Sequence, residues 1–161
     1  MIFNRRSQAA LEFLTTYGWA FLVILIMIGA LAYFGVLKPS RLLPDRCTIS
    51  PEFECQDFQI SKTNDEIKVR LKNNAGEPIT IDSMRVTAES SASLSCNSPD
   101  TKGTWSVGEI RDFTFENCNS DAVGFVIGEK GKAIFSIRFY EVRSGSGYAH
   151  DITGEIFSTV V

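Results

Sequence analysis

The chain has 161 residues, of which 44% are hydrophobic and 22% charged, within the ordinary range of globular proteins. Its net charge of −3, with no clustered basic stretch, gives no reason to expect a nucleic-acid partner. The sequence contains no internal repeat and no low-complexity tract.

The first element is an apolar run near the N-terminus. No charged residue occurs between Phe13 and Leu37, and this length is sufficient to span a bilayer as a helix. Arg5 and Arg6 precede the run, and Glu12 lies just before it. A charged side chain at the bilayer centre costs about 2.5 to 3.5 kcal/mol on insertion scales, so Glu12 requires a partner or a function.

Two general interpretations of this segment are a secretory signal peptide and a permanent membrane anchor. A signal peptide needs a basic start, a shorter apolar stretch and a small-x-small cleavage site, which Ala30-Leu31-Ala32 would supply. The run is long for such a peptide, and Glu12 interrupts its start. A permanent anchor fits the length, with the arginines holding the N-terminus in the cytoplasm and the residues from Lys38 onward outside.

The residues before the apolar run favour a third interpretation. Ser7 is small, follows Arg5 and Arg6, and begins the sequence SQAALEFLTTYGWA, which contains Gln8 and Glu12. This arrangement resembles the class III signal peptide of archaeal type IV pilin-like proteins. The resemblance covers about the first 46 residues, and the rest of the chain only in general style.

The resemblance implies that a prepilin-type peptidase cuts between Ser7 and Gln8 on the cytoplasmic side and removes a leader peptide, residues 1–7. Glu12 then becomes the fifth residue of the mature chain, where the family carries a glutamate. The family often has glycine or alanine before the cut, whereas this chain has Ser7, which is also a small residue.

The cleaved chain is expected to form a helix over residues 8–37, about 45 Å long. Because the helix is apolar on every side, it suits a membrane or the interior of a large assembly. The new α-amino group at Gln8 is available to pair with Glu12, in the same chain or a neighbour, unless the glutamine cyclises. Glu12 would also lie in the first turn, where a negative charge suits the helix dipole. The alternative is an interfacial charge without a role.

Residues 38–46 are expected to form a linker. Pro39 disfavours helix at Lys38 and so ends the apolar helix, and Pro44 lies within the same stretch.

All four cysteines follow the apolar run, and in an exported domain an even number indicates disulfides. Of three possible pairings, Cys47–Cys55 with Cys96–Cys118 is favoured, because one closes a short loop and the other flanks a Gly/Ser/Asn-rich stretch. A four-cysteine zinc site and free buried thiols are the alternatives, although no C-x-x-C pair is present.

Residues 47–161 are expected to form a β domain. Apolar and polar residues alternate with the period of half-buried strands in 66–74, 109–116 and 132–143. The alternation in 78–89 slips at Asp82-Ser83, which indicates a bulge or bend. Ser144–Gly147 turns the chain into 148–161 as a C-terminal hairpin. The core positions predicted by this pattern are Ile67, Val69, Leu71, Phe113, Phe115, Phe135, Ile137 and Phe139.

With no convincing helix after Leu37, five to seven strands argue for an antiparallel sandwich, immunoglobulin-like in type. The fold class is therefore α+β, a single N-terminal hydrophobic helix followed by an all-β head. By resemblance, this matches the β head of archaeal filament subunits.

Catalytic chemistry is not expected. His150 is the only histidine, next to Asp151, with no nucleophile motif nearby and no second histidine for a metal. Acidic residues such as Asp57, Asp65 and Glu66 lack the spacing of a calcium loop. No cofactor, metal or enzymatic activity is predicted, and no Asn-x-Ser/Thr glycosylation acceptor occurs.

These features and the resemblance predict a structural subunit of an archaeal type IV pilus-like filament. Its expected partners are copies of itself, the membrane, the prepilin-type peptidase and the pilus assembly machinery. It would pass through the membrane once, with its head outside, and then enter an extracellular filament. The alternative is a monomeric surface binding module tethered by an uncleaved helix. The sequence leaves adhesion, motility and DNA exchange open.

Overall fold

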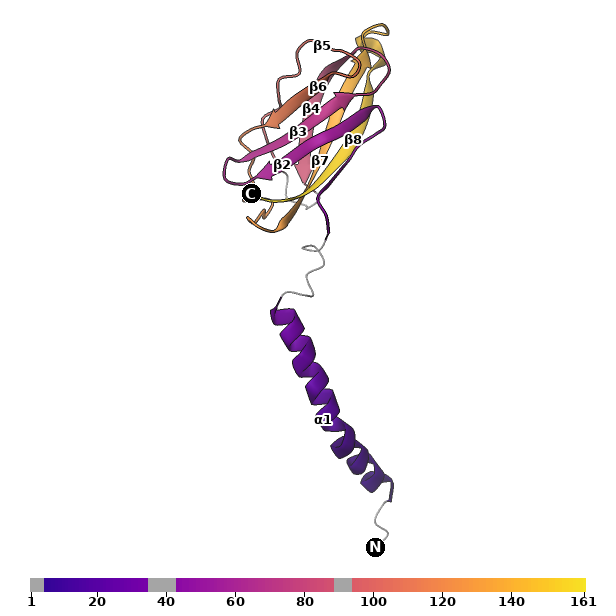
Figure 1. Cartoon of the computed structure of the whole chain (residues 1–161), viewed down its shortest axis with the longest axis vertical. Helices are drawn as coiled ribbons and strands as arrows, with labels where there is room; N and C mark the ends of the chain where they lie inside the picture. The colour runs from indigo at the N-terminus through magenta and orange to yellow at the C-terminus, as the bar shows by residue number, and fades with distance from the viewer. Residues whose placement is uncertain (1–4, 35–42, 89–93) are drawn as a thin grey trace. The chain divides into compact units, whose positions relative to one another are not determined.

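The computed structural model of the chain describes residues 5–34, 43–88 and 94–161. The chain divides into two compact units, Met1–Leu42 and Leu43–Val161. Among the described residues, the first unit contains one helix and the second contains two β sheets (Figure 1). The predicted α+β fold, an apolar N-terminal helix followed by a β-sandwich head, is confirmed.

The helix α1 spans Arg5–Tyr33. It begins three residues before the expected start at residue 8, and its backbone runs through Ser7 and Gln8 without a break. The Phe34 amide donates to the Ala30 carbonyl at 2.9 Å, one turn back. Residues 35–37 of the expected helix and residues 38–42 of the expected linker lie outside the described residues.

The head forms two sheets with the strand orders β1-β8-β7-β4-β5 and β2-β3-β6, and all pairings between strands are antiparallel. The strands are β1 (Arg46–Thr48), β2 (Phe53–Ser61), β3 (Glu66–Asn73), β4 (Ile79–Ala88), β5 (Thr104–Trp105), β6 (Ile110–Phe115), β7 (Lys130–Glu141) and β8 (His150–Thr159). A single 3-10 turn, η2 (Ser146–Tyr148), precedes β8 within the described part of the head. The described residues contain eight strands, more than the expected five to seven, because β1 and β5 are too short to show any periodicity.

The alternating apolar residues meet between the sheets, as predicted. Every core position expected from the alternation is at most 4% exposed, and these residues belong to one cluster that draws on both sheets. Four of its aromatic rings contact one another. The ring centroid of Trp105 lies 5.3 Å from that of Phe53 and 5.4 Å from that of Phe113, and the centroid of Phe139 lies 5.1 Å from that of Phe53.

Two irregularities bend the strands. The register of β4 against β7 shifts between Ile81 and Ser83, so the bulge predicted at Asp82-Ser83 is confirmed. A second register shift, between Cys55 and Asp57 of β2, was not visible in the sequence pattern. The predicted C-terminal hairpin is also present, because β7 and β8 pair from Lys130–Thr159 to Phe139–His150.

Disulfides join Cys47 to Cys55 and Cys96 to Cys118, the pairing that the sequence favoured. The first bond connects β1 in one sheet to β2 in the other. The second attaches the segment after residue 94 to the chain beyond β6, where the Asn97 amide donates to the Glu116 carbonyl at 2.8 Å. No cysteine is free, so neither the zinc alternative nor the free-thiol alternative describes this chain.

Candidate assembly site

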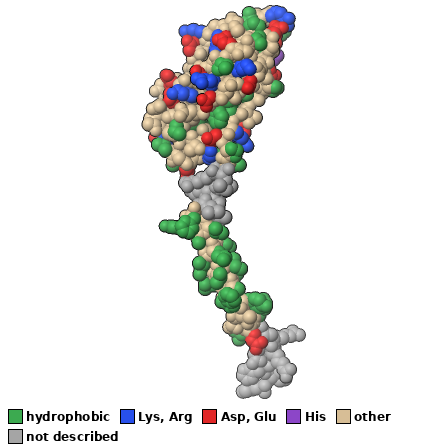
Figure 2. Space-filling model, viewed as in Figure 1, with side chains coloured by type: hydrophobic (Ala, Val, Ile, Leu, Met, Phe, Trp, Pro, Cys, Tyr) green, Lys and Arg blue, Asp and Glu red, His purple; other side chains and the backbone are tan. Residues whose placement is uncertain are grey.

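The surface of α1 is apolar around its whole circumference. Leu11–Tyr33 has a mean hydropathy of 2.0 and no buried residue within the unit, so by length and composition it is able to cross a membrane. Figure 2 shows hydrophobic side chains along the described length of this helix. A helix of this kind leaves its side chains without partners in water, so it requires lipid or other helices.

Glu12 is the only charged residue from Leu11 to Phe34, and its side chain is exposed. Because α1 begins at Arg5, the first turn contains no acidic residue and Glu12 lies about two turns into the helix. The expected first-turn position therefore applies only to a chain that starts at Gln8. One turn further on, the Thr15 hydroxyl donates to the Leu11 and Glu12 carbonyls, at 3.0 and 3.1 Å, so it is satisfied within the helix.

The expected cleavage junction, Ser7–Gln8, has helical backbone. The side chains of Ser7, Gln8, Arg5 and Arg6 lie outside the description, as do residues 1–4 entirely. The backbone is therefore helical at the junction, and cleavage between Ser7 and Gln8 stays a prediction.

Gly18 and Gly29 offer places for close helix approach. A Cβ added at either position would meet no atom within 4 Å. Eleven positions separate the two glycines, which corresponds to about three turns and places both on the same side of α1. Small residues on one face allow membrane helices to pack closely, as the sequence indicated.

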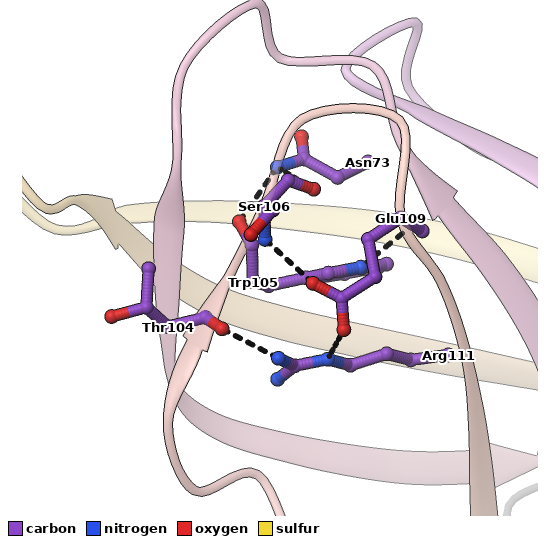
Figure 3. Close-up of polar contacts among 6 residues, drawn as sticks. All are labelled: Asn73, Thr104, Trp105, Ser106, Glu109 and Arg111. Carbon is purple, nitrogen blue, oxygen red and sulfur yellow. Dashed lines mark hydrogen bonds and ion pairs between the residues drawn. The ribbon is translucent and has the colours of Figure 1, made fainter.

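The head contains a polar network that sequence reasoning missed. Asn73 at the end of β3 is fully buried, and its side-chain amide donates to the carbonyl of Glu77 at 3.1 Å. The same amide donates to the carbonyl of Trp105 at 3.0 Å (Figure 3). Its side-chain oxygen accepts from the Ala75 amide at 2.9 Å. Asn73 thus joins the β3–β4 turn to the β5–β6 turn.

The same turn is held on its outer side by Glu109. The carboxylate pairs with Arg111 at 2.8 Å and accepts from the Ser106 amide at 2.8 Å (Figure 3). The Arg111 guanidinium, and next the Ser106 amide, lower the pKa of Glu109 below its usual range. The indole N–H of Trp105 donates to the Glu109 carbonyl at 2.9 Å. No buried side-chain nitrogen or oxygen among the described residues lacks a hydrogen-bond partner, and the contacts of this network join two turns of the head.

The face of the β2-β3-β6 sheet carries charged pairs. Arg70 forms two hydrogen bonds to Asp112, at 2.6 and 2.9 Å, and lowers the pKa of that carboxyl. A groove of about 560 Å³ runs over this face, with Arg70, Asp112 and Lys68 in its lining. Lys68 pairs with Glu66 at 2.7 Å, so the cations of the groove are neutralised within the protein.

His150 begins β8, with its ring centroid 5.9 Å from that of Phe139. Among the described residues, no group of three or more His, Cys, Asp or Glu side chains is placed to hold a metal. The side chain of His150 is exposed at the strand end.

The site and fold define a class, a disulfide-bonded β-sandwich carrying an N-terminal helix apolar and long enough to cross a membrane. No protein-family model matches the chain, and no curated protein matches it.

Proposed function

We propose that the protein is a structural subunit of an archaeal type IV pilus-like cell-surface filament. In this proposal a prepilin-type peptidase removes residues 1–7, and α1 then leaves the bilayer to pack among copies of itself. The head remains outside the cell, on the filament surface. Adhesion, motility and DNA exchange are all compatible with such a subunit.

One observation carries the proposal: a helix without any buried side chain over Leu11–Tyr33 has a single carboxylate, Glu12, at the end of its apolar stretch. A membrane anchor gains nothing from this charge, because lipid offers it no partner. A helix that assembles with copies of itself gains a preferred alignment from this charge, because a carboxylate that is misplaced in an apolar core lacks a partner and raises the free energy of the assembly. Glu12 therefore favours one axial register between helices.

Cleavage provides the partner. A cut between Ser7 and Gln8 creates an α-amino group four residues before Glu12, one turn away on a helix. In a bundle this amine can belong to the same subunit or to the next. A charge-assisted hydrogen bond of this kind contributes about 1.5 to 3 kcal/mol.

The second candidate is a monomeric binding module tethered by an uncleaved α1. The observation that favours it is the length of the apolar segment, Leu11–Tyr33, which suits a permanent single span. This candidate assigns no partner to Glu12 and requires no processing.

Intact mass spectrometry of the membrane-bound protein distinguishes the two candidates. We expect the mass of a chain that begins at Gln8, with a shift for pyroglutamate if the glutamine has cyclised. The control is Ser7→Trp, whose bulk should prevent the peptidase from admitting the junction and leave the precursor uncut. A full-length chain in the wild type would contradict the filament proposal and support the tether. Normal processing of the Ser7→Trp variant would show that the cut lies elsewhere.

A further inference from the structure

Four aliphatic side chains are exposed at the end of the head where the chain enters from the linker. They are Leu43 (48% exposed), Val126 (50%), Ile127 (60%) and Val161 (44%). We call these four residues the entry patch. The four residues come from three segments far apart in the sequence: the start of the head, the turn before β7 and the C-terminus.

Backbone hydrogen bonds hold two of these segments together. The Val126–Gly128 turn is closed by the Glu129 amide, which donates to the Val126 carbonyl at 3.0 Å. Gly128 then donates to the Val160 carbonyl at 2.8 Å, next to Val161. The carbonyl of Val161 itself accepts from the Lys62 amide at 2.8 Å. The exposed side chains thus lie on a fixed framework.

Asp45 attaches the entering chain to the same end of the head. Its carboxylate accepts from the Thr159 amide at 3.0 Å and also pairs with Lys130. Leu43 precedes Asp45 by two residues, so its segment joins the head where Asp45 contacts Thr159, close in sequence to Val161. In Figure 1 the C-terminus marks this end of the head.

Two lysines next to the entry patch, Lys62 and Lys130, are paired within the head. Lys62 pairs with Asp121 at 2.8 Å and also donates to the Phe125 carbonyl at 2.7 Å. Lys130 is paired with Asp45, as described above. Since both lysines next to the patch are neutralised within the protein, attraction to anionic headgroups is not required to explain the surface.

We infer that the entry patch rests on the interfacial layer of the lipid bilayer while the protein is anchored. The inference depends on the membrane placement of α1, which is part of the proposed function. The chain from Tyr33 to Leu43 reaches at most about 35 Å when fully extended, so the patch stays close to the membrane surface. A tether this short gives the patch a high effective concentration at the bilayer.

Size argues against a second copy as the occupant. Half-exposed aliphatic side chains offer at most about 100 Å² each, or about 400 Å² for the entry patch. A stable protein interface needs about 800 Å² from each partner, with matching shape. A bilayer surface needs no matching shape, so a small apolar patch on a short tether suffices.

The test measures the membrane depth of labels at the two ends of the head. All four native cysteines are in disulfides, so one added cysteine provides a unique thiol in the oxidised, full-length protein. Ile127→Cys places an environment-sensitive fluorophore in the entry patch. Tyr148→Cys, at a residue 71% exposed beside the opposite end of the β7–β8 hairpin, is the matched control. Both uncut variants are first floated with phosphatidylcholine vesicles to show that they bind the membrane, and are then reconstituted in phosphatidylcholine nanodiscs with one protein each.

We expect the fluorophore at Ile127→Cys to emit at a shorter wavelength than the fluorophore at Tyr148→Cys. We also expect lipids that carry a doxyl group near the headgroup to quench its fluorescence at least about twofold more strongly. Equal, water-like behaviour at both sites in protein that floats with vesicles would overturn the inference and leave the filament proposal intact. A blue shift that appears only with several copies per disc, and without quenching by the lipids, would show that a second copy covers the entry patch. That result would also overturn the inference. Failure to float with vesicles would contradict both proposals. Val126→Cys repeats the measurement if Ile127→Cys does not fold.

Discussion

Glu12 is a carboxylate on a helix whose other side chains from Leu11 to Phe34 are uncharged. We expect Glu12→Gln to insert into the membrane as the wild type does and to reduce filament yield by about tenfold or more. The reason is the loss of a charge-assisted pair worth about 1.5 to 3 kcal/mol, where 1.4 kcal/mol corresponds to a factor of ten. Electron microscopy of sheared filaments measures the yield. Glu12→Asp, which keeps the charge, is the control, and normal assembly of the glutamine variant would contradict the pairing.

Asn73 is the residue whose loss should affect the head most through hydrogen bonding. Asn73→Ala leaves the buried carbonyl of Trp105 and the amide of Ala75 without their partner, at a cost of about 1 to 3 kcal/mol for each unsatisfied group. Urea denaturation of the head should show this loss in the free energy of unfolding. Asn74→Ala is the matched control, because that neighbouring side chain is exposed. Equal stability of the two variants would show that the network contributes little.

Gly154 is required by the packing of Phe135, which lies opposite it across β7 and β8. A Cβ at this position would lie 2.4 Å from the Phe135 ring, which is itself fully buried. We expect Gly154→Ala to destabilise the head by about 1 to 3 kcal/mol, the usual cost of overpacking. Thermal melting compares it with Gly147→Ala, where an added Cβ meets nothing within 4 Å. A melting temperature equal to that of the control would contradict the predicted clash.

At the scale of elements, the long strands were predictable because each buries one face only. Ile67, Val69 and Leu71 alternate with charged residues in β3, and the slip at Asp82-Ser83 in β4 marked the bulge. The short strands β1 and β5 were not predictable, since two or three residues carry no period. Their positions depend on long-range features, namely the Cys47–Cys55 bond and the burial of Trp105.

The residues of the candidate assembly site come from the sequence, and their role in assembly stays a prediction. Glu12 and the two glycines were identified from charge and size alone. The start of α1 at Arg5 was not predicted, because the helix was expected to begin at Gln8, after the cut that follows Ser7. The Asn73 network was missed altogether, since a buried asparagine next to a second asparagine in a turn sequence has no local signal.

The two disulfides should both stabilise the head, through restriction of the unfolded chain. Their sequence separations are 8 and 22, so the longer loop gains less than about 1 kcal/mol over the shorter one. We expect replacement of either cysteine pair by serine to cost about 2 to 4 kcal/mol in the free energy of unfolding. Denaturation with and without reductant measures the effect. Peptide mapping without reduction is the control, and a Cys47–Cys96 peptide or four free thiols would contradict the pairing.

At the scale of the whole molecule, the head has what it needs to fold without the helix. Its core cluster is drawn from both sheets, and each core residue lies between Phe53 and Val160. The disulfides and the Asp45 contacts also lie within Leu43–Val161. About 119 residues are sufficient for one independent core.

A chain consisting of residues 43–161 should therefore be soluble, monomeric and folded when it is produced under oxidising conditions. Its far-UV circular dichroism should show a mainly β signal, and thermal unfolding should be one cooperative transition, since a single core unfolds as a unit. The same chain with Gly154→Ala should melt at a lower temperature, which ties the transition to the core around Phe135. Strong helical minima would contradict the sandwich. A gradual loss of signal without a transition would show that the head depends on α1 for its stability.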